Sequence, residues 1–182
     1  MDAPFELPLI NLELGNVHSK WVNAENYHLT VIFIGETELE HIDKISMALH
    51  QIVAHIPSFS FKIKGIGKFQ NRRSSGVLWL GVEDNAVLKT LHNEVSNALL
   101  KLLPNLKNLY KDYTPHITVA RIKDREELSS FKLLLDKLNL NVLQKVNEIL
   151  LYESVSNAHG VDYSVLERFA LNKKGRSKKN RP

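Results

Sequence analysis

Two short segments of the chain repeat the same arrangement of histidine and threonine. His28 and Thr30 are separated by one residue, and so are His116 and Thr118. Each pair begins an apolar, β-branched run, which is typical of a β-strand. Alternate residues of a strand face the same side, so each histidine is expected to share a face with its threonine. Two imidazoles and two hydroxyls favour acid–base chemistry on an anionic substrate.

The repetition itself is evidence that the two pairs belong together. With 8 His and 5 Thr in 182 residues, chance alone gives the His-X-Thr pattern about 0.2 times, so two occurrences are unusual. Either histidine taken alone is more simply explained as an ordinary surface or core imidazole. Both, however, begin a predicted strand and precede a helix signal at nearly the same offset, which favours a shared function.

Composition indicates a globular chain without disulfides. The 182 residues suit one domain, or two small lobes that share a core, and the 43% hydrophobic and 24% charged content is ordinary. No apolar run approaches the roughly 18 residues that a membrane helix needs, and Asp2 and Glu6 interrupt the region where a secretory signal would be apolar. The absence of cysteine excludes thiolate metal sites and a cysteine nucleophile. We therefore expect a cytoplasmic protein.

A basic segment at the C-terminus supplies much of the formal net charge of +4. Residues 173–182 contain six lysines and arginines and no large apolar side chain, so this tail is expected to be disordered. A solvated tail is the favoured interpretation, and weak attraction to RNA phosphates is the alternative. The folded domain is expected to span residues 1–172.

Hydrophobic periodicity predicts the order strand, helix, strand, strand in each half of the chain. After the first motif, Thr37 and Glu40 form a capping-box pattern that opens a helix ending before Pro57. The remaining predicted elements are strands near 59–64 and at 76–83, a bridging helix over 88–102, a helix capped by Asp124 that continues to Leu138, and strands at 145–152 and 162–171. The fold class that follows is α+β. Each half forms one lobe, and two antiparallel sheets with helices outside them face a central groove where the two motifs meet.

These residues resemble the two signature motifs of the two-histidine (2H) phosphoesterases. The segments are 26–35 and 113–121, in the same order as in the family and at a fitting spacing. Residues 67–69 and 77–82 are similar to the branch of bacterial and archaeal RNA 2′,3′-cyclic phosphodiesterases, once called 2′-5′ RNA ligases. The resemblance covers roughly residues 20–171. The family usually opens with a full strand and a longer helix, and here that first helix is expected to be shortened or lost.

The resemblance implies hydrolysis of an RNA 2′,3′-cyclic phosphodiester end to a 2′-phosphomonoester, with possible reverse 2′-5′ ligation. It implies His28 as the proton donor to the 3′ oxygen and His116 as the proton acceptor from water. From the residues alone the two roles stay interchangeable, because any histidine can change charge between about pH 5 and 8. Thr30 and Thr118 can donate hydrogen bonds to the non-bridging oxygens. No metal or other cofactor is expected, since the other histidines form no ligand pattern, and a monomer is expected.

Four further residues are candidates for substrate contacts. Arg121 follows the second motif and resembles the family's arginine, although strict strand alternation places it opposite to the histidine unless the strand ends or twists there; a surface salt bridge is the alternative. Tyr113 can stack on a base or pack against the protein. Arg72 and Arg73 lie in a polar loop, where solvated charge is the simpler interpretation. Both tryptophans are expected in the core.

Two other functions stay open at this point. The same site can act on another substrate, such as ADP-ribose cyclic phosphate or 2′-5′ oligoadenylate. A non-catalytic RNA-binding module would keep the groove and the basic tail, but binding alone does not require two titrating groups. A turnover assay on a cyclic-phosphate nucleotide, with and without a chelator, distinguishes these functions.

Overall fold

The chain forms two compact units, each assembled from three separate segments. The computed structural model describes residues 20–70, 76–104, 113–122, 140–157 and 160–173. Unit 1 is made of Met1–Thr30, Lys62–Glu83 and Thr114–Gln144, and unit 2 of Val31–Phe61, Asp84–Tyr113 and Lys145–Pro182. Because both units draw on the two halves of the sequence, neither half folds as one unit.

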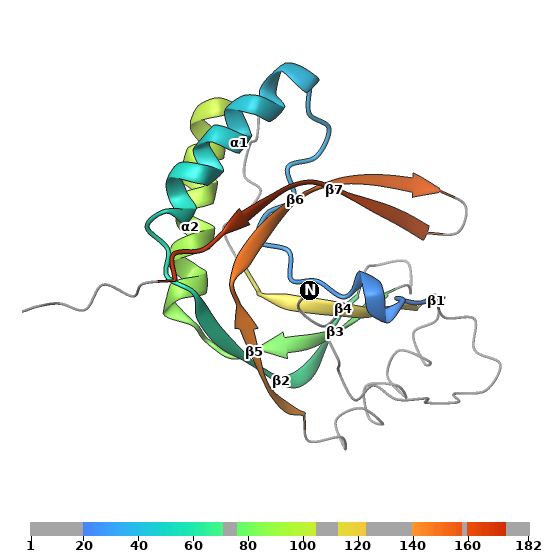
Figure 1. Ribbon diagram of the computed structural model, residues 1–182. Helices are drawn as coiled ribbons and strands as arrows, with labels where there is room; N and C mark the ends of the chain where they lie inside the picture. Colours follow the sequence, from blue (N-terminus) through green and yellow to red (C-terminus); the bar gives the residue numbers. More distant parts are fainter. Residues whose placement is uncertain (1–19, 71–75, 105–112, 123–139, 158–159, 174–182) are drawn as a thin grey trace, which may run out of the picture. The chain divides into compact units, whose positions relative to one another are not determined.

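The core of unit 1 is a five-stranded sheet with the order β1-β4-β3-β2-β5 (Figure 1). The strands are β1 (Lys20–Trp21), β2 (Phe59–Gln70), β3 (Gly76–Val82), β4 (His116–Ile122) and β5 (Asn141–Val146). Along β3, Leu78 and Leu80 are fully buried, whereas Val77 and Trp79 are only half-buried. This alternation gives the sheet one closely packed face and one partly open face.

A β-bulge interrupts β4 within the second motif. Thr118 and Ala120 of β4 pair with two consecutive residues of β3, Trp79 and Leu78. Val119 is therefore an extra residue without a partner on β3. A bulge of this kind shifts the residues beyond it to the opposite face of the strand. Each residue of β4 after the bulge therefore lies on the face opposite to the one that it would occupy in a regular strand.

The first motif lies along the edge of β4 and not in a continuous strand. β1 pairs with the far end of β4, and Leu29 then forms an isolated antiparallel bridge with Ile117. A short 3₁₀ helix, η1 (Ala24–Asn26), separates the pairing of β1 from the bridge at Leu29. The strand predicted through residues 30–34 is therefore wrong. Beyond Leu29 this segment has no ladder with a described strand, and its aliphatic side chains pack against the core of unit 2.

Unit 2 contains two helices and a long β-hairpin (Figure 1). Its elements are α1 (Leu39–Val53), α2 (Ala86–Leu102), β6 (Glu148–Asn157) and β7 (Gly160–Ala170). Apolar residues at helical spacing bury one face of each helix in a shared core, where α1 contacts both α2 and β7. The buried core contains Ile45, Leu49, Ile52, Val53, Ile56, Leu91, Val95, Leu99, Phe169 and Leu171. Hydrophobic burial along these two helical stripes therefore holds the unit together.

Most predicted elements of the described chain are confirmed, with shifts at their ends. Asn85 caps α2, because its side chain accepts a hydrogen bond from a backbone N–H at 2.9 Å. The capping box at Thr37 is wrong: α1 begins after Glu38, and the Thr37 hydroxyl donates to the carbonyl of Gly35 at 3.1 Å. The strand predicted at 145–152 is the end of β5 and the start of β6, with one residue between them.

The α+β class is confirmed, and the predicted pair of pseudo-symmetric lobes within residues 1–172 stays a prediction. Both motifs fall in unit 1, whereas α1 and α2 belong to unit 2. Long-range strand pairing, which local periodicity does not report, decides this division. The helix predicted over 124–138, the N-terminal residues up to 19 and the tail at 174–182 lie outside the described residues.

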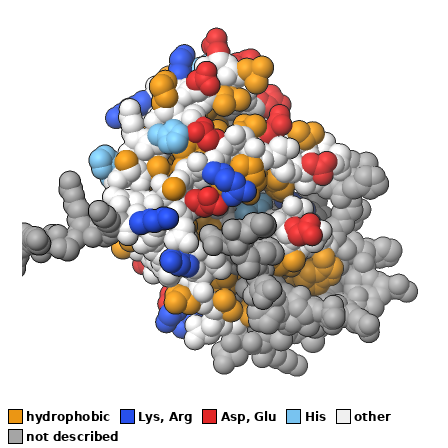
Figure 2. Space-filling model, viewed as in Figure 1, with side chains coloured by type: hydrophobic (Ala, Val, Ile, Leu, Met, Phe, Trp, Pro, Cys, Tyr) orange, Lys and Arg blue, Asp and Glu red, His pale blue; other side chains and the backbone are white. Residues whose placement is uncertain are grey.

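Neither helix of the described chain is long and apolar enough to cross a membrane. On the face that Figure 2 shows, acidic and basic side chains are interspersed and no patch of one charge stands out.

A polar cluster joins α1 to β7 on the surface of unit 2. The Ser46 hydroxyl donates to Oε2 of Glu167, and Nε2 of His50 lies 2.7 Å from Oε1 of the same carboxylate. Hydrogen bonds from Ser46 and then from His50 lower the pKa of Glu167 below its ordinary value of 4.5. The charged carboxylate therefore stabilises the folded state.

We expect Glu167→Gln to destabilise the protein at neutral pH, and the difference from wild type to shrink in acid. The folded pKa of Glu167 is lower than the unfolded one, so its contribution is fully present above about pH 4.5 and is lost as the pH falls through the lowered value. Urea unfolding of both proteins at about pH 7 and pH 3 measures this linkage. If the urea midpoints of wild type and Glu167→Gln differ by the same amount at both pH values, this prediction is contradicted.

Candidate active site

The antiparallel bridge between Leu29 and Ile117 brings the two His-X-Thr motifs side by side in unit 1. In antiparallel pairing, the neighbours of two bridged residues oppose each other crosswise. The histidine of each motif therefore lies across from the threonine of the other. Ile117 is fully buried, so its neighbours lie on the opposite, partly open face. The residues that define this site face are His28, Thr30, His116 and Thr118.

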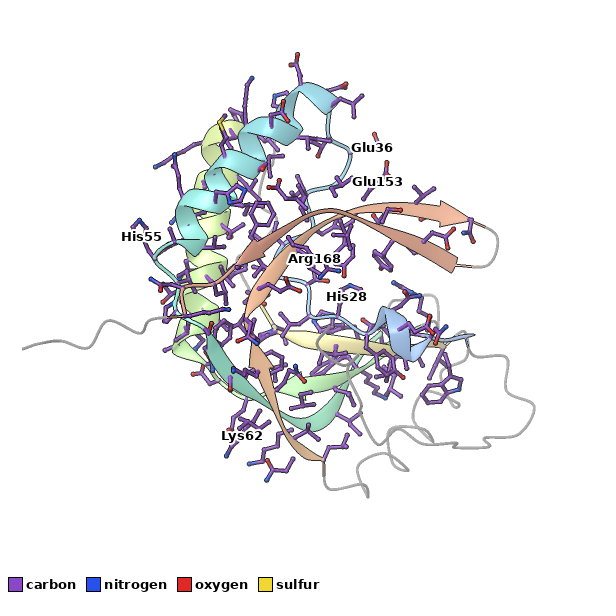
Figure 3. The ribbon with its side chains drawn as sticks, viewed as in Figure 1. His28, Glu36, His55, Lys62, Glu153 and Arg168 are labelled. Carbon is purple, nitrogen blue, oxygen red and sulfur yellow. The ribbon has the colours of Figure 1, made fainter. Side chains whose placement is uncertain are left out.

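The crosswise pairing sets the distance between the two imidazoles. Opposed residues of an antiparallel pair have Cβ atoms about 4.5–5.5 Å apart, and diagonal residues are about 7–8 Å apart. His28 and His116 form the diagonal pair, and both are half-buried. Figure 3 shows His28 on the segment that runs beside β4. The two histidines are therefore diagonal neighbours across the bridge and not directly opposed.

Each of these histidines is oriented by a backbone carbonyl two residues before it. Nδ1 of His28 lies 2.8 Å from the carbonyl oxygen of Asn26, and Nδ1 of His116 lies 2.7 Å from that of Thr114. A carbonyl oxygen can only accept a hydrogen bond, so Nδ1 carries the proton in each neutral ring. Nε2 is then the nitrogen of each ring that can take up or release a proton.

The bulge at Val119 brings Arg121 onto the site face. Arg121 pairs with Val77, which lies on the same side of β3 as Trp79, the partner of Thr118. The placement expected from strict strand alternation is therefore wrong, because the extra residue reverses the alternation. The exposed guanidinium can bind a phosphate through two parallel N–H groups.

Two aromatic side chains that sequence reasoning did not assign to the site lie beside His116. Phe69 meets the imidazole edge-to-face with ring centroids 4.9 Å apart, and the centroid of Trp79 lies at 5.9 Å. Trp79 is only half-buried and Trp21 is 38% exposed, so the expectation of two core tryptophans is wrong. The strand register places Phe69 and Trp79 on the site face, and no pattern within the sequence predicts this register.

Another predicted substrate contact, Tyr113, has an aromatic partner within its own unit. Tyr113 belongs to unit 2 and stacks on His92 of α2, with ring centroids 3.9 Å apart and ring planes at 7°. Burial raises the pKa of the Tyr113 hydroxyl and lowers that of the His92 imidazole. The packed alternative for Tyr113 is therefore the better one. Arg72 and Arg73 lie outside the described residues.

No group of three or more His, Cys, Asp or Glu side chains in the described ranges is arranged to hold a metal ion. The site face instead combines imidazoles, hydroxyls and a guanidinium. A metal-free reaction stays a prediction, which the chelator assay below tests.

The fold and the paired motifs together define a phosphoesterase with two histidines, one on β4 and one on the segment bridged to β4 at Leu29. Residues 12–157 match the model of the 2′-5′ RNA ligase superfamily. The chain belongs to this superfamily, and the resemblance seen in the two motifs is confirmed.

Curated relatives of the chain are named RNA 2′,3′-cyclic phosphodiesterase. The Thermotoga maritima protein is 33% identical over 147 residues, which are 80% of this chain and 76% of that protein. The Aquifex aeolicus protein is 34% identical over 160 residues, 85% of this chain and 83% of the relative.

Solved structures share the fold. A Thermus thermophilus protein has a TM-score of 0.70 at 23% identity, and the match covers 86% of this chain and 84% of that one. Escherichia coli LigT complexed with 3′-AMP has a TM-score of 0.67 at 24% identity, covering 84% of this chain and 81% of LigT. These likenesses confirm the α+β architecture of the family.

We expect both site histidines to be Nδ1–H tautomers when neutral. The carbonyls of Asn26 and Thr114 stabilise that form, whereas a solvated histidine favours Nε2–H. Long-range ¹H–¹⁵N NMR spectra above about pH 8, where imidazoles are neutral, identify the protonated nitrogen. His55, which is exposed just beyond α1 (Figure 3), is the internal control. Spectra of His28 or His116 that match the control would contradict the geometry.

Proposed function

We propose that this protein hydrolyses RNA 2′,3′-cyclic phosphodiester ends to 2′-phosphomonoesters by acid–base catalysis with its two histidines. The crosswise pairing of the motifs carries the proposal, because it sets two carbonyl-oriented imidazoles and two hydroxyls on one face. The relatives named RNA 2′,3′-cyclic phosphodiesterase support the choice of substrate.

In the proposed reaction, a water molecule attacks phosphorus while the bond between phosphorus and the 3′ oxygen breaks. His116 is neutral before this step and takes a proton from the water at Nε2. His28 is protonated and gives its Nε2 proton to the 3′ oxygen, which leaves as a hydroxyl. The attacking and leaving oxygens lie in line on opposite sides of phosphorus, and a diagonal pair of imidazoles suits this need. Exchange with solvent then returns both rings to their starting charge states.

The hydroxyls and the guanidinium stabilise charge on the phosphate in this scheme. Thr30 and Thr118 donate hydrogen bonds to the non-bridging oxygens, where negative charge accumulates. Thr118 is held by the pairing of β4 with β3, and Thr30 directly follows the bridge at Leu29, so their backbones are in place before the substrate arrives. Arg121 adds a permanent positive charge on the same face.

The same arrangement permits 2′-5′ ligation when a 5′-hydroxyl replaces the water as the nucleophile. Phosphorus then becomes bonded to the 5′ oxygen, the bond to the 3′ oxygen breaks, and the proton transfers are unchanged. ADP-ribose cyclic phosphate and 2′-5′ oligoadenylate remain the alternative substrates. Comparing turnover of these compounds with that of a cyclic-phosphate RNA decides between them.

We expect His28→Ala and His116→Ala each to lower turnover of a 2′,3′-cyclic nucleotide by about 10²–10⁴-fold, the usual contribution of a general acid or base. Thr30→Val and Thr118→Val remove one donor each, and should lose less than the about 10²–10³-fold typical of an oxyanion donor, because the site face is partly open to water. Steady-state rates measure the losses, and ³¹P NMR identifies the product as the 2′-phosphate.

His55→Ala is the matched control, because it removes an exposed imidazole from unit 2 and should turn over like wild type. Circular dichroism checks the fold of each variant. Near-normal turnover by either folded His28 or His116 variant would rule out the two-histidine mechanism. Wild-type protein that binds RNA but turns over no cyclic phosphate would instead favour the binding module.

We expect activity to persist in excess chelator and to show a bell-shaped pH dependence. The acidic limb reports loss of the neutral base and the basic limb loss of the protonated acid, so the apparent values belong to the pair. Rates measured from about pH 5 to 9, with and without chelator, span the range in which imidazoles titrate. Activity lost to the chelator and restored by an added metal would contradict this scheme.

A further inference from the structure

Three aromatic rings from three adjacent strands form a cluster on the site face. The cluster consists of Phe69 of β2, Trp79 of β3 and His116 of β4. Phe69 lies 5.1 Å from Trp79 with planes tilted by 38°, and it meets His116 at 84° and 4.9 Å. Trp79 lies 5.9 Å from His116 at 53°. Phe69 and Trp79 together are called the aromatic wall below.

Gly67 provides the space that the aromatic wall occupies. It pairs with Trp79 across the ladder of β2 and β3. A Cβ placed on Gly67 would lie 2.0 Å from Cη2 and 2.1 Å from Cζ2 of the indole. The indole therefore lies directly over the backbone of β2, and only glycine allows this close approach. Any side chain at position 67 would push the indole out of its place.

Stability alone does not explain the two residues of the aromatic wall. The indole Nε1 of Trp79 is buried, and it has no hydrogen-bond partner in the described part of the chain. Burying an unpaired N–H group is unfavourable. Phe69 leaves 42% of its surface exposed, so it gains less from burial than a phenylalanine in the core. What the two rings share is contact with the imidazole of His116.

We propose that Phe69 and Trp79 are positioning residues that hold the His116 ring in the orientation needed for proton transfer. The hydrogen bond from Nδ1 to the Thr114 carbonyl fixes one point of the ring, about which the imidazole can still swing. Edge-to-face contact with Phe69 and tilted contact with Trp79 restrict that swing from two directions.

The consequence for turnover rests on the proposed function, whereas the consequence for ring orientation does not. Displacing a reacting group by about 1 Å can cost about 10²-fold in rate. A loosened imidazole should therefore lower kcat and leave substrate binding nearly unchanged. A structural role alone would lower stability without changing which ring nitrogen carries the proton.

The test replaces each ring of the aromatic wall by leucine, as Trp79→Leu and Phe69→Leu. We expect the neutral His116 imidazole to change from the single Nδ1–H form to a mixture of tautomers in ¹H–¹⁵N spectra. On 2′,3′-cyclic AMP, kcat should fall about 10- to 100-fold while KM changes less than about twofold. His28 is the internal control, because its own carbonyl at Asn26 orients it.

Two further variants test whether the place of the Trp79 ring matters, or only the presence of the indole. Trp79→Phe keeps an aromatic ring and removes the unpaired N–H, so it should retain most of the rate and the His116 tautomer. Gly67→Ala keeps the indole but displaces it, and should therefore resemble Trp79→Leu. Circular dichroism and thermal melting of all four variants check that the sheet remains folded.

The outcomes distinguish this proposal from its competitors. A single Nδ1–H tautomer in both leucine variants and in Gly67→Ala would show that the Thr114 carbonyl suffices, and would overturn the proposal. So would a raised KM with unchanged kcat, which would indicate that the aromatic wall contacts the base of the substrate. The spectra need no turnover, so an inactive wild-type protein with the expected tautomer changes would refute only the proposed function.

Discussion

One antiparallel bridge, between Leu29 and Ile117, determines the geometry of the candidate site. Side chains alternate across a strand, so a slip of one residue in this pairing would turn one motif toward the packed face. The full burial of Ile117 opposes such a slip, because its side chain would have to leave the apolar layer. A single hydrophobic anchor therefore fixes where both imidazoles and both hydroxyls lie.

The bulge at Val119 is the second constraint, because it decides on which face of the sheet the charged side chain of Arg121 lies. It lets the same short strand place a buried aliphatic layer on one face and both His116 and Arg121 on the other. A regular strand of this sequence would leave the guanidinium on the packed face, where an unpaired charge is unfavourable. The irregular register thus resolves a conflict between packing and function.

Residue spacing in the sequence predicted the elements that depend on interactions between residues close together in the chain. The paired motifs, α1, α2 and β3 follow from residue spacing, because apolar periodicity reports directly on neighbouring turns or alternate residues. The face of Arg121, the place of Trp79 beside His116 and the division into units did not follow. Each of these depends on which distant segments pair and in what register, and a bulge or an isolated bridge has no marker in the residues that form it. The roles of the two histidines likewise rest on the family resemblance.

The acceptors that orient His28 and His116 are peptide carbonyls from the same short segments. Many enzymes use a carboxylate for this purpose, and a carboxylate loses its charge in acid and strengthens the base that it holds. A carbonyl does neither, since it has no titrating proton and no net charge. Each three-residue segment is therefore a self-contained module that sets the tautomer of its own neutral ring without a second ionisable group.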